Sequence, residues 1–223
     1  MIKPHGSDSL DPRLVSADRA QQLLAEAETL PSLLINSAAA ANAVMLGAGY
    51  FNPLKGYMNL ADALSVSTTM HNEDGLFWPV PVLNMAHDVS AIEGASRIAL
   101  RDPNTDGNPI MAVMDVAAIE SVSDQQIDTM AEAIFGTTDA EHPGVATFTN
   151  LGRFVVSGIL KCLTLAISKQ TFLIPSAPRK RFVKRLLNAV GTRLWHSKLA
   201  IQCIELMKNF AVWRWSDWMP MVW

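Results

Sequence analysis

The chain has 223 residues, of which 49% are hydrophobic and 17% are charged, so it is long enough to bury a core in one or two domains. The polar N-terminus lacks the apolar stretch of a signal peptide, and no run of 18 apolar residues indicates a membrane span. Two cysteines, Cys162 and Cys203, match neither a disulfide framework nor a zinc pattern. We therefore expect a cytoplasmic protein with no membrane partner.

The net charge of −3 conceals two regions of opposite sign. Residues 1–158 contain 7 Lys and Arg against 19 Asp and Glu, whereas residues 159–223 contain 11 against 2. Five of the six tryptophans also follow Gly158. A change this abrupt predicts a domain boundary near Gly158, a binding tail, or a second part of different origin.

Short helices and strands alternate along the first region and predict an α+β domain. Ser16 and Asn59 are expected to cap helices, and Ser123 with Gln126 forms a capping box. In chain order we expect an extended arm over residues 1–16, a helix over 17–28, a strand over 33–36, a helix over 38–46 stopped by Gly47, a helix over 59–70, an edge or bulged strand over 76–85, a hairpin of strands 97–101 and 110–116, a helix over 123–135 and a strand over 154–156.

Residues 47–58 read Gly-Ala-Gly-Tyr-Phe-Asn-Pro-Leu-Lys-Gly-Tyr-Met and lie between two expected helices. Three glycines and a proline require tight backbone turns, while the apolar side chains among them still need to pack. Local rules therefore predict a buried structural turn.

The same stretch resembles the Gly-x-x-x-Pro-Leu-x-Gly-Phe-Met signature in the N-terminal domain of ATP sulfurylases (sulfate adenylyltransferases). Residues 1–8 (Met-Ile-Lys-Pro-His-Gly-Ser-Asp), 76–83 (Leu-Phe-Trp-Pro-Val-Pro-Val-Leu) and 142–146 (His-Pro-Gly-Val-Ala) resemble the bacterial form found in sulfur-oxidising organisms. The resemblance covers residues 1–158 and implies a PUA-like β-barrel with added helices over that domain.

The resemblance also implies a reaction in which a sulfate oxygen attacks the α-phosphorus of ATP and pyrophosphate leaves. The intact family enzyme uses ATP, sulfate and Mg²⁺, and joining two anions requires positive and hydrogen-bonding groups. The family supplies these groups through Gln-Thr-Arg-Asn-Pro, His-x-x-His and Gly-Arg-Asp-His motifs in a second domain. None of these motifs occurs in this chain. We therefore expect no catalytic, cofactor-binding or metal-binding residues in it, and no cofactor.

No two of the five histidines are three residues apart, as the family's His-x-x-His motif requires; they are His5, His71, His87, His142 and His196. His142 precedes Pro143 and Gly144, where it could contact a ligand. We expect it to be a hydrogen-bonded loop histidine instead. The acidic residues are expected to form a solvated surface without a general acid and base pair.

A shifted reading frame restores the missing motif. Permitted codons for residues 194–210, regrouped from the third base of the first codon, encode Val-Ala-Phe-Gln-Thr-Arg-Asn-Pro-Met-His-Arg-Ala-His-Glu-Glu-Leu. Regrouping from about Lys161 gives segments that resemble the start of the family's catalytic domain. We therefore interpret residues 159–223 as an out-of-frame, non-native tail, poorly ordered or adventitiously helical. A mutation, a pseudogene and a sequencing error all remain open as its origin.

Two functions compete. The first is a truncated, inactive fragment of a sulfate adenylyltransferase. The second is a PUA-like RNA-binding module in which the basic aromatic tail contacts phosphates and bases. The charge of −12 on residues 1–158 repels nucleic acid, so we expect no nucleic-acid partner. Association with intact sulfurylase subunits, as in a homo-oligomer, stays open.

Overall fold

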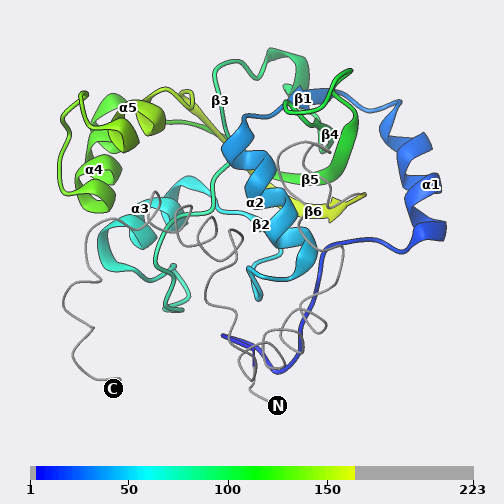
Figure 1. Cartoon of the computed structure of the whole chain (residues 1–223), viewed down its shortest axis with the longest axis horizontal. Coiled ribbons are helices and arrows are strands. Elements are labelled where there is room, and N and C mark those ends of the chain that lie inside the picture. Colours follow the sequence, from blue (N-terminus) through cyan, green and yellow to red (C-terminus); the bar gives the residue numbers. More distant parts are fainter. Residues whose placement is uncertain (1–3, 164–223) are drawn as a thin grey trace, which may run out of the picture.

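The computed structural model describes residues 4–163 and contains one mixed β-sheet with helices around it (Figure 1). The sheet has six strands in the order β1-β4-β5-β6-β2, and β3 also pairs with β6. The expected α+β class is confirmed. The interpretation of the tail as out-of-frame concerns residues that, beyond Leu163, lie outside the described part of the chain.

The helices are α1 (Ala17–Ala27), α2 (Ser37–Ala48), α3 (Leu60–Thr69), α4 (Asp124–Phe135) and α5 (Pro143–Thr149), with a short 3-10 helix at Ser90–Ile92. The strands are β1 (Ser32–Leu34), β2 (Gly56–Tyr57), β3 (Met85–Ala86), β4 (Arg97–Arg101), β5 (Ile110–Ser121) and β6 (Phe154–Cys162). None of the helices among residues 4–163 is both long and apolar enough to cross a membrane.

Two of the three helix caps expected from the sequence form as hydrogen bonds. The side chain of Asn59 accepts a bond from the backbone N–H of Asp62 at the start of α3. Ser123 and Gln126 form the reciprocal capping box of α4, which ends at Gly136 in the left-handed conformation. Ser16 precedes α1 as expected, but its side chain makes no capping bond.

The structure corrects the end of α2. The sequence predicts a stop at Gly47, but the helix runs to Ala48 and Gly49 adopts the left-handed conformation with φ of 79°. Gly47 is buried inside the last turn, and its carbonyl accepts a bond from the N–H of Leu14. Either glycine can terminate a helix, so the choice depends on the arm packed against this turn.

Two further segments differ from the sequence prediction. Of the expected 76–85 strand, only Met85 lies in a strand of the sheet, β3 (Met85–Ala86), because Pro79 and Pro81 lack the N–H groups that a ladder requires. Helix α5 was not predicted. It begins with Pro143 in its first turn, a position that tolerates proline because that N–H has no partner inside the helix.

β6 is an interior strand of the sheet and pairs with three other strands. It pairs with β5 along most of its length on one side and with β2 and β3 on the other. The strand continues four residues past Gly158, the position where the composition changes. Leu160 and Cys162 in this continuation are buried in the main core.

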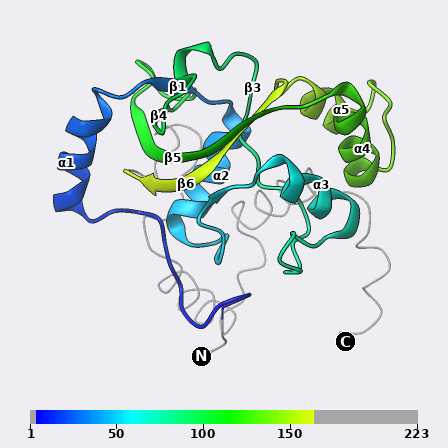
Figure 2. The same cartoon turned by 180° about the vertical axis from the view of Figure 1, so that it is seen from behind.

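Three apolar clusters hold the helices to the sheet. α2 lies across one face and contributes Ala39, Ala43 and Val44 to the main cluster. α3, α4 and α5 form a lobe with its own cluster at one end of the sheet, while α1 covers a third cluster at the other end (Figures 1 and 2). The lobe and α1 therefore do not cover the edge of the sheet near the C-terminal end of α2. The N-terminal arm and the turn at residues 49–58 lie there instead.

Two buried polar hydrogens point at carbonyl groups of α2. The Tyr57 hydroxyl donates to the carbonyl of Ala39 at 2.7 Å, and the Cys162 thiol donates to the carbonyl of Ala43 at 3.3 Å. Burial raises the pKa of Tyr57 well above its ordinary value, with a further contribution from Cys162. Burial also raises the pKa of the Cys162 thiol to about 12.

The free energy of unfolding is expected to fall at alkaline pH because of Cys162. An unfolded thiol ionises near pH 8.5, whereas the folded chain keeps this proton until the pKa of about 12. The stabilisation is therefore complete below about pH 8.5 and is lost as the pH rises towards 12, at about 1.4 kcal/mol per pH unit. Between about pH 8 and pH 9.5, urea unfolding of the full chain should show a loss of about 1 kcal/mol that is absent from Cys162→Ala. Equal losses in both proteins would contradict the prediction.

Candidate functional site

The turn at residues 49–58 ties the N-terminal arm to the sheet. Its Asn52 is 4% exposed and bonds the arm with both ends of its amide. Oδ1 accepts from the backbone N–H of Asp11 at 3.0 Å, and Nδ2 donates to the hydroxyl of Ser7 at 2.8 Å. The peptide bond between Asn52 and Pro53 is cis. Asn52, which stands at an unspecified position of the sulfurylase-like signature, therefore holds the arm through its side chain.

The second half of the turn enters the sheet as β2. Gly56 pairs with Ile159, and a Cβ on Gly56 would overlap the carbonyl oxygen of Gly158 in the neighbouring strand. Tyr57 is buried under α2, and the N–H of Met58 donates to the carbonyl of Val82 at 3.0 Å. The prediction of a buried structural turn is confirmed.

The arm continues from the turn to the end of β6. The guanidinium Nε of Arg13 donates to the carbonyl of Leu160 at 3.1 Å, and Leu14 donates to Gly47 at 3.1 Å. Val15 donates to the carbonyl of Cys162 at 3.0 Å. The expected extended arm is therefore a structural strap along the edge of the domain.

Five rings from three chain segments meet beside the turn, and we call them the aromatic face: His5, Phe51, His71, Phe77 and Trp78. The centroid of Phe77 lies 6.4 Å from that of His5 and 5.7 Å from that of His71. Trp78 lies 5.8 Å from Phe51 and 6.1 Å from His5. Phe77 is 49% exposed, whereas Trp78 beneath it is 8% exposed. This face is not evident from the sequence, in which the adjacent aromatic residues Phe77 and Trp78 between Gly75 and Pro79 are the one signal for it.

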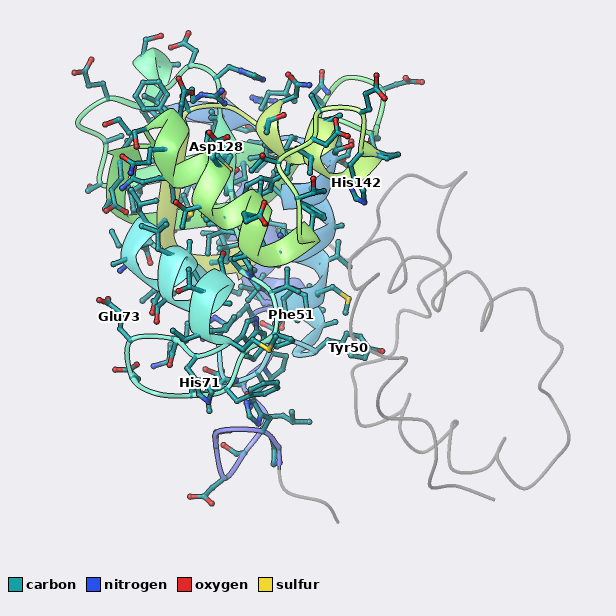
Figure 3. All side chains as sticks on the ribbon, turned by 90° about the vertical axis from the view of Figure 1, so that its left-hand side faces the viewer. Tyr50, Phe51, His71, Glu73, Asp128 and His142 are labelled. Carbon is teal, nitrogen blue, oxygen red and sulfur yellow. The ribbon has the colours of Figure 1, made fainter. Side chains whose placement is uncertain are left out.

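His142 occupies the N-cap of α5 and lies away from His71 in Figure 3. Its Nδ1 accepts from the N–H groups of Gly144 and Val145 at 3.2 and 3.4 Å. The expectation that it is a hydrogen-bonded residue is confirmed, with a helix cap in place of a loop contact.

Replacing His142 by alanine is expected to cost about 1 kcal/mol of stability, because two backbone N–H groups of α5 lose their acceptor. His142→Asn is the matched control, since asparagine is a preferred N-cap and restores an acceptor. Thermal unfolding of the three proteins measures the difference. An asparagine variant as unstable as the alanine variant would show that the cap is not the source of the loss.

The remaining titratable groups are dispersed. Among residues 4–163 no three His, Cys, Asp or Glu side chains are arranged to hold a metal ion. Lys161 pairs with Asp115 at 2.9 Å, and Arg153 pairs with Asp124 at 3.0 Å. Lys161 and Arg153 therefore face carboxylates. The main features of the described surface are the edge held by the N-terminal arm and the exposed aromatic face.

A family model described as a PUA-like domain matches residues 2–165. The sulfate adenylyltransferase of Alcanivorax borkumensis is 54% identical over 195 residues, which cover 85% of this chain and 49% of that protein. The sulfate adenylyltransferase of Allochromatium vinosum is 54% identical over 173 residues, covering 77% of this chain and 44% of that one. The chain thus spans about half the length of these curated relatives.

Among solved structures, a hexameric APS kinase from Thiobacillus denitrificans matches with a TM-score of 0.57 and 22% identity. The match covers 83% of this chain and 32% of that one, and at this identity it supports the fold alone. The resemblance to sulfate adenylyltransferases is confirmed by the two relatives. The chain belongs to the PUA-like domain family, in a form similar to that of the sulfate adenylyltransferases.

Proposed function

We propose that this chain is the PUA-like portion of a sulfate adenylyltransferase and that it has no adenylyltransferase activity on its own. The observation that carries the proposal is the 54% identity to the Alcanivorax borkumensis enzyme, of which the chain covers 49%. The family reaction converts ATP and sulfate to adenylyl sulfate and pyrophosphate. Its Gln-Thr-Arg-Asn-Pro and His-x-x-His motifs do not occur in the 223 residues.

The geometry of the described residues supports a structural role. Bringing sulfate and ATP together needs unpaired positive or hydrogen-bonding groups aimed at one point. In the turn at residues 49–58, the Asn52 side chain instead bonds the arm and the Tyr57 hydroxyl bonds a carbonyl of α2. Lys161 and Arg153 each pair with a carboxylate.

The charge of the domain disfavours the RNA-binding alternative. Residues 4–163 contain 7 Lys and Arg against 19 Asp and Glu. Protein binding to a phosphate backbone depends on clustered Lys and Arg that displace counterions, and this surface would repel that backbone.

Two assays test the proposal. The purified full chain, given ATP, sulfate and Mg²⁺, is expected to release no pyrophosphate above background. A chimera in which residues 1–163 replace the matched part of the Alcanivorax borkumensis enzyme is expected to form adenylyl sulfate at a rate within about tenfold of the parent enzyme. Activity of the chain alone, or a folded but inactive chimera, would overturn the proposal.

A further inference from the structure

We infer that the aromatic face is the surface on which the remaining half of a sulfate adenylyltransferase packs against this domain. The inference rests on the proposed function and adds the location of the contact. Its occupant is a folded domain that continues the same chain, as in relatives about twice as long as the matched region.

The aromatic face is partly exposed and apolar. Phe77 is 49% exposed and Met70, which accepts a bond from the N–H of Trp78, is 38% exposed. None of the five residues of the face is Asp, Glu, Lys or Arg, although the exposed Glu73 and Asp74 lie between His71 and Phe77 in the same loop. Exposed aromatic and Met side chains next to a buried Trp, with charged residues at their border, resemble the apolar centre and polar rim of a protein interface.

The aromatic face is held in place by the arm and the turn. His5 Nε2 lies 2.7 Å from the carbonyl oxygen of Phe77, so the arm fixes the loop that carries the exposed ring. Phe51 contacts Trp78 from the other side. A surface whose rings are already fixed in place loses little side-chain entropy when a partner covers it.

The described chain ends beside the arm that leads to the aromatic face. β6 ends at Cys162, whose backbone bonds Arg13 and Val15 of the arm. The arm then leads from Arg13 back to His5 at the aromatic face. Its eight residues would span at most about 29 Å if fully extended, and the turns and bends at residues 5–9 shorten that span, so the end of β6 lies on the part of the domain that the arm joins to the face.

The test uses the chimera described above with two substitutions that keep the local backbone. Phe77→Ser removes the exposed ring. Met70→Asn removes the exposed thioether at a position with φ of 57°, where asparagine is well tolerated. Leu34→Ser is the control, since Leu34 is the 54% exposed residue of edge strand β1. Circular dichroism of the same variants in the present chain checks that the domain itself still folds.

The unmodified chimera is expected to unfold in one calorimetric transition and to form adenylyl sulfate. Phe77→Ser and Met70→Asn should separate the two halves, giving two transitions at least about 5 °C apart, while Leu34→Ser keeps one. A single, unshifted transition in both face variants of an active chimera overturns the inference and leaves the proposed function standing. A folded chimera without activity overturns the proposed function itself.

Discussion

Replacing Gly56 by alanine is expected to lower the stability of the domain by more than about 3 kcal/mol, a large share of the roughly 5–15 kcal/mol that holds a domain of this kind folded. The added methyl would overlap the carbonyl oxygen of Gly158. That oxygen belongs to the backbone of β6, an interior strand of the sheet, so the clash cannot be relieved by a side-chain rotation. The strands would have to separate, and the β2 pairing that closes the edge of the sheet would be lost.

The matched control is Gly75→Ala. Gly75 has a φ of 76°, and a Cβ placed on it meets nothing within 4 Å. Alanine there is expected to cost about 1–2 kcal/mol, the price of the left-handed conformation alone. Urea unfolding of the full chain, followed by far-ultraviolet circular dichroism, measures both. A Gly56 variant no less stable than the Gly75 variant would show that β2 and β6 can move apart without loss.

A one-base change of reading frame near the codons for residues 154–161 is expected to turn an inactive product into an active enzyme. The present frame contains no Gln-Thr-Arg-Asn-Pro motif, whereas the shifted frame of residues 194–210 permits it in full, followed by Met-His-Arg-Ala-His. These groups are the expected source of transition-state stabilisation, so the frame-corrected product should exceed the present chain in adenylyl sulfate formation by at least about 10³-fold.

Deep sequencing of the source DNA across these codons shows which frame the gene carries. Expression of both versions then measures pyrophosphate release from ATP and sulfate. A frame-corrected protein that is soluble and folded but inactive would contradict the out-of-frame interpretation. The structure constrains where the reading frame changes. Residues up to Cys162 belong to β6, and Leu160 is fully buried within this strand.

Local features of this fold were readable from the sequence. Asn59 and the pair Ser123 and Gln126 identify helix starts because a cap is decided by residues within one turn. The buried turn was predicted from its glycines and proline, and its glycine at position 56 is now explained by a contact with Gly158, about 100 residues away. The turn itself can be predicted from neighbouring residues. The requirement for glycine at position 56 depends on a strand that is distant in the sequence.

Features assembled from distant segments were not readable. The aromatic face combines His5 of the arm, Phe51 of the turn and Phe77 of a later loop, and no periodicity connects them. The choice of Gly49 over Gly47 as the end of α2 depends on the arm as well. Tertiary contacts determine both the aromatic face and the end of α2. The distances between the contacting segments cannot be read from a single sequence.

During synthesis, β5 has to wait for its partner strand β6, which is made later. β5 ends at Ser121 and β6 ends at Cys162, 41 residues later. A ribosome adds about 5–20 residues per second, so β5 emerges about 2–8 s before the strand that pairs with it along most of its length. During that interval the nascent chain presents an unpaired edge rich in Met, Ala and Val, which is the kind of edge that recruits other strands. The period of greatest exposure to aggregation is therefore set by the order in which the strands are synthesised. Nascent-chain chaperones would act on this protein after α4 and before β6 have been made.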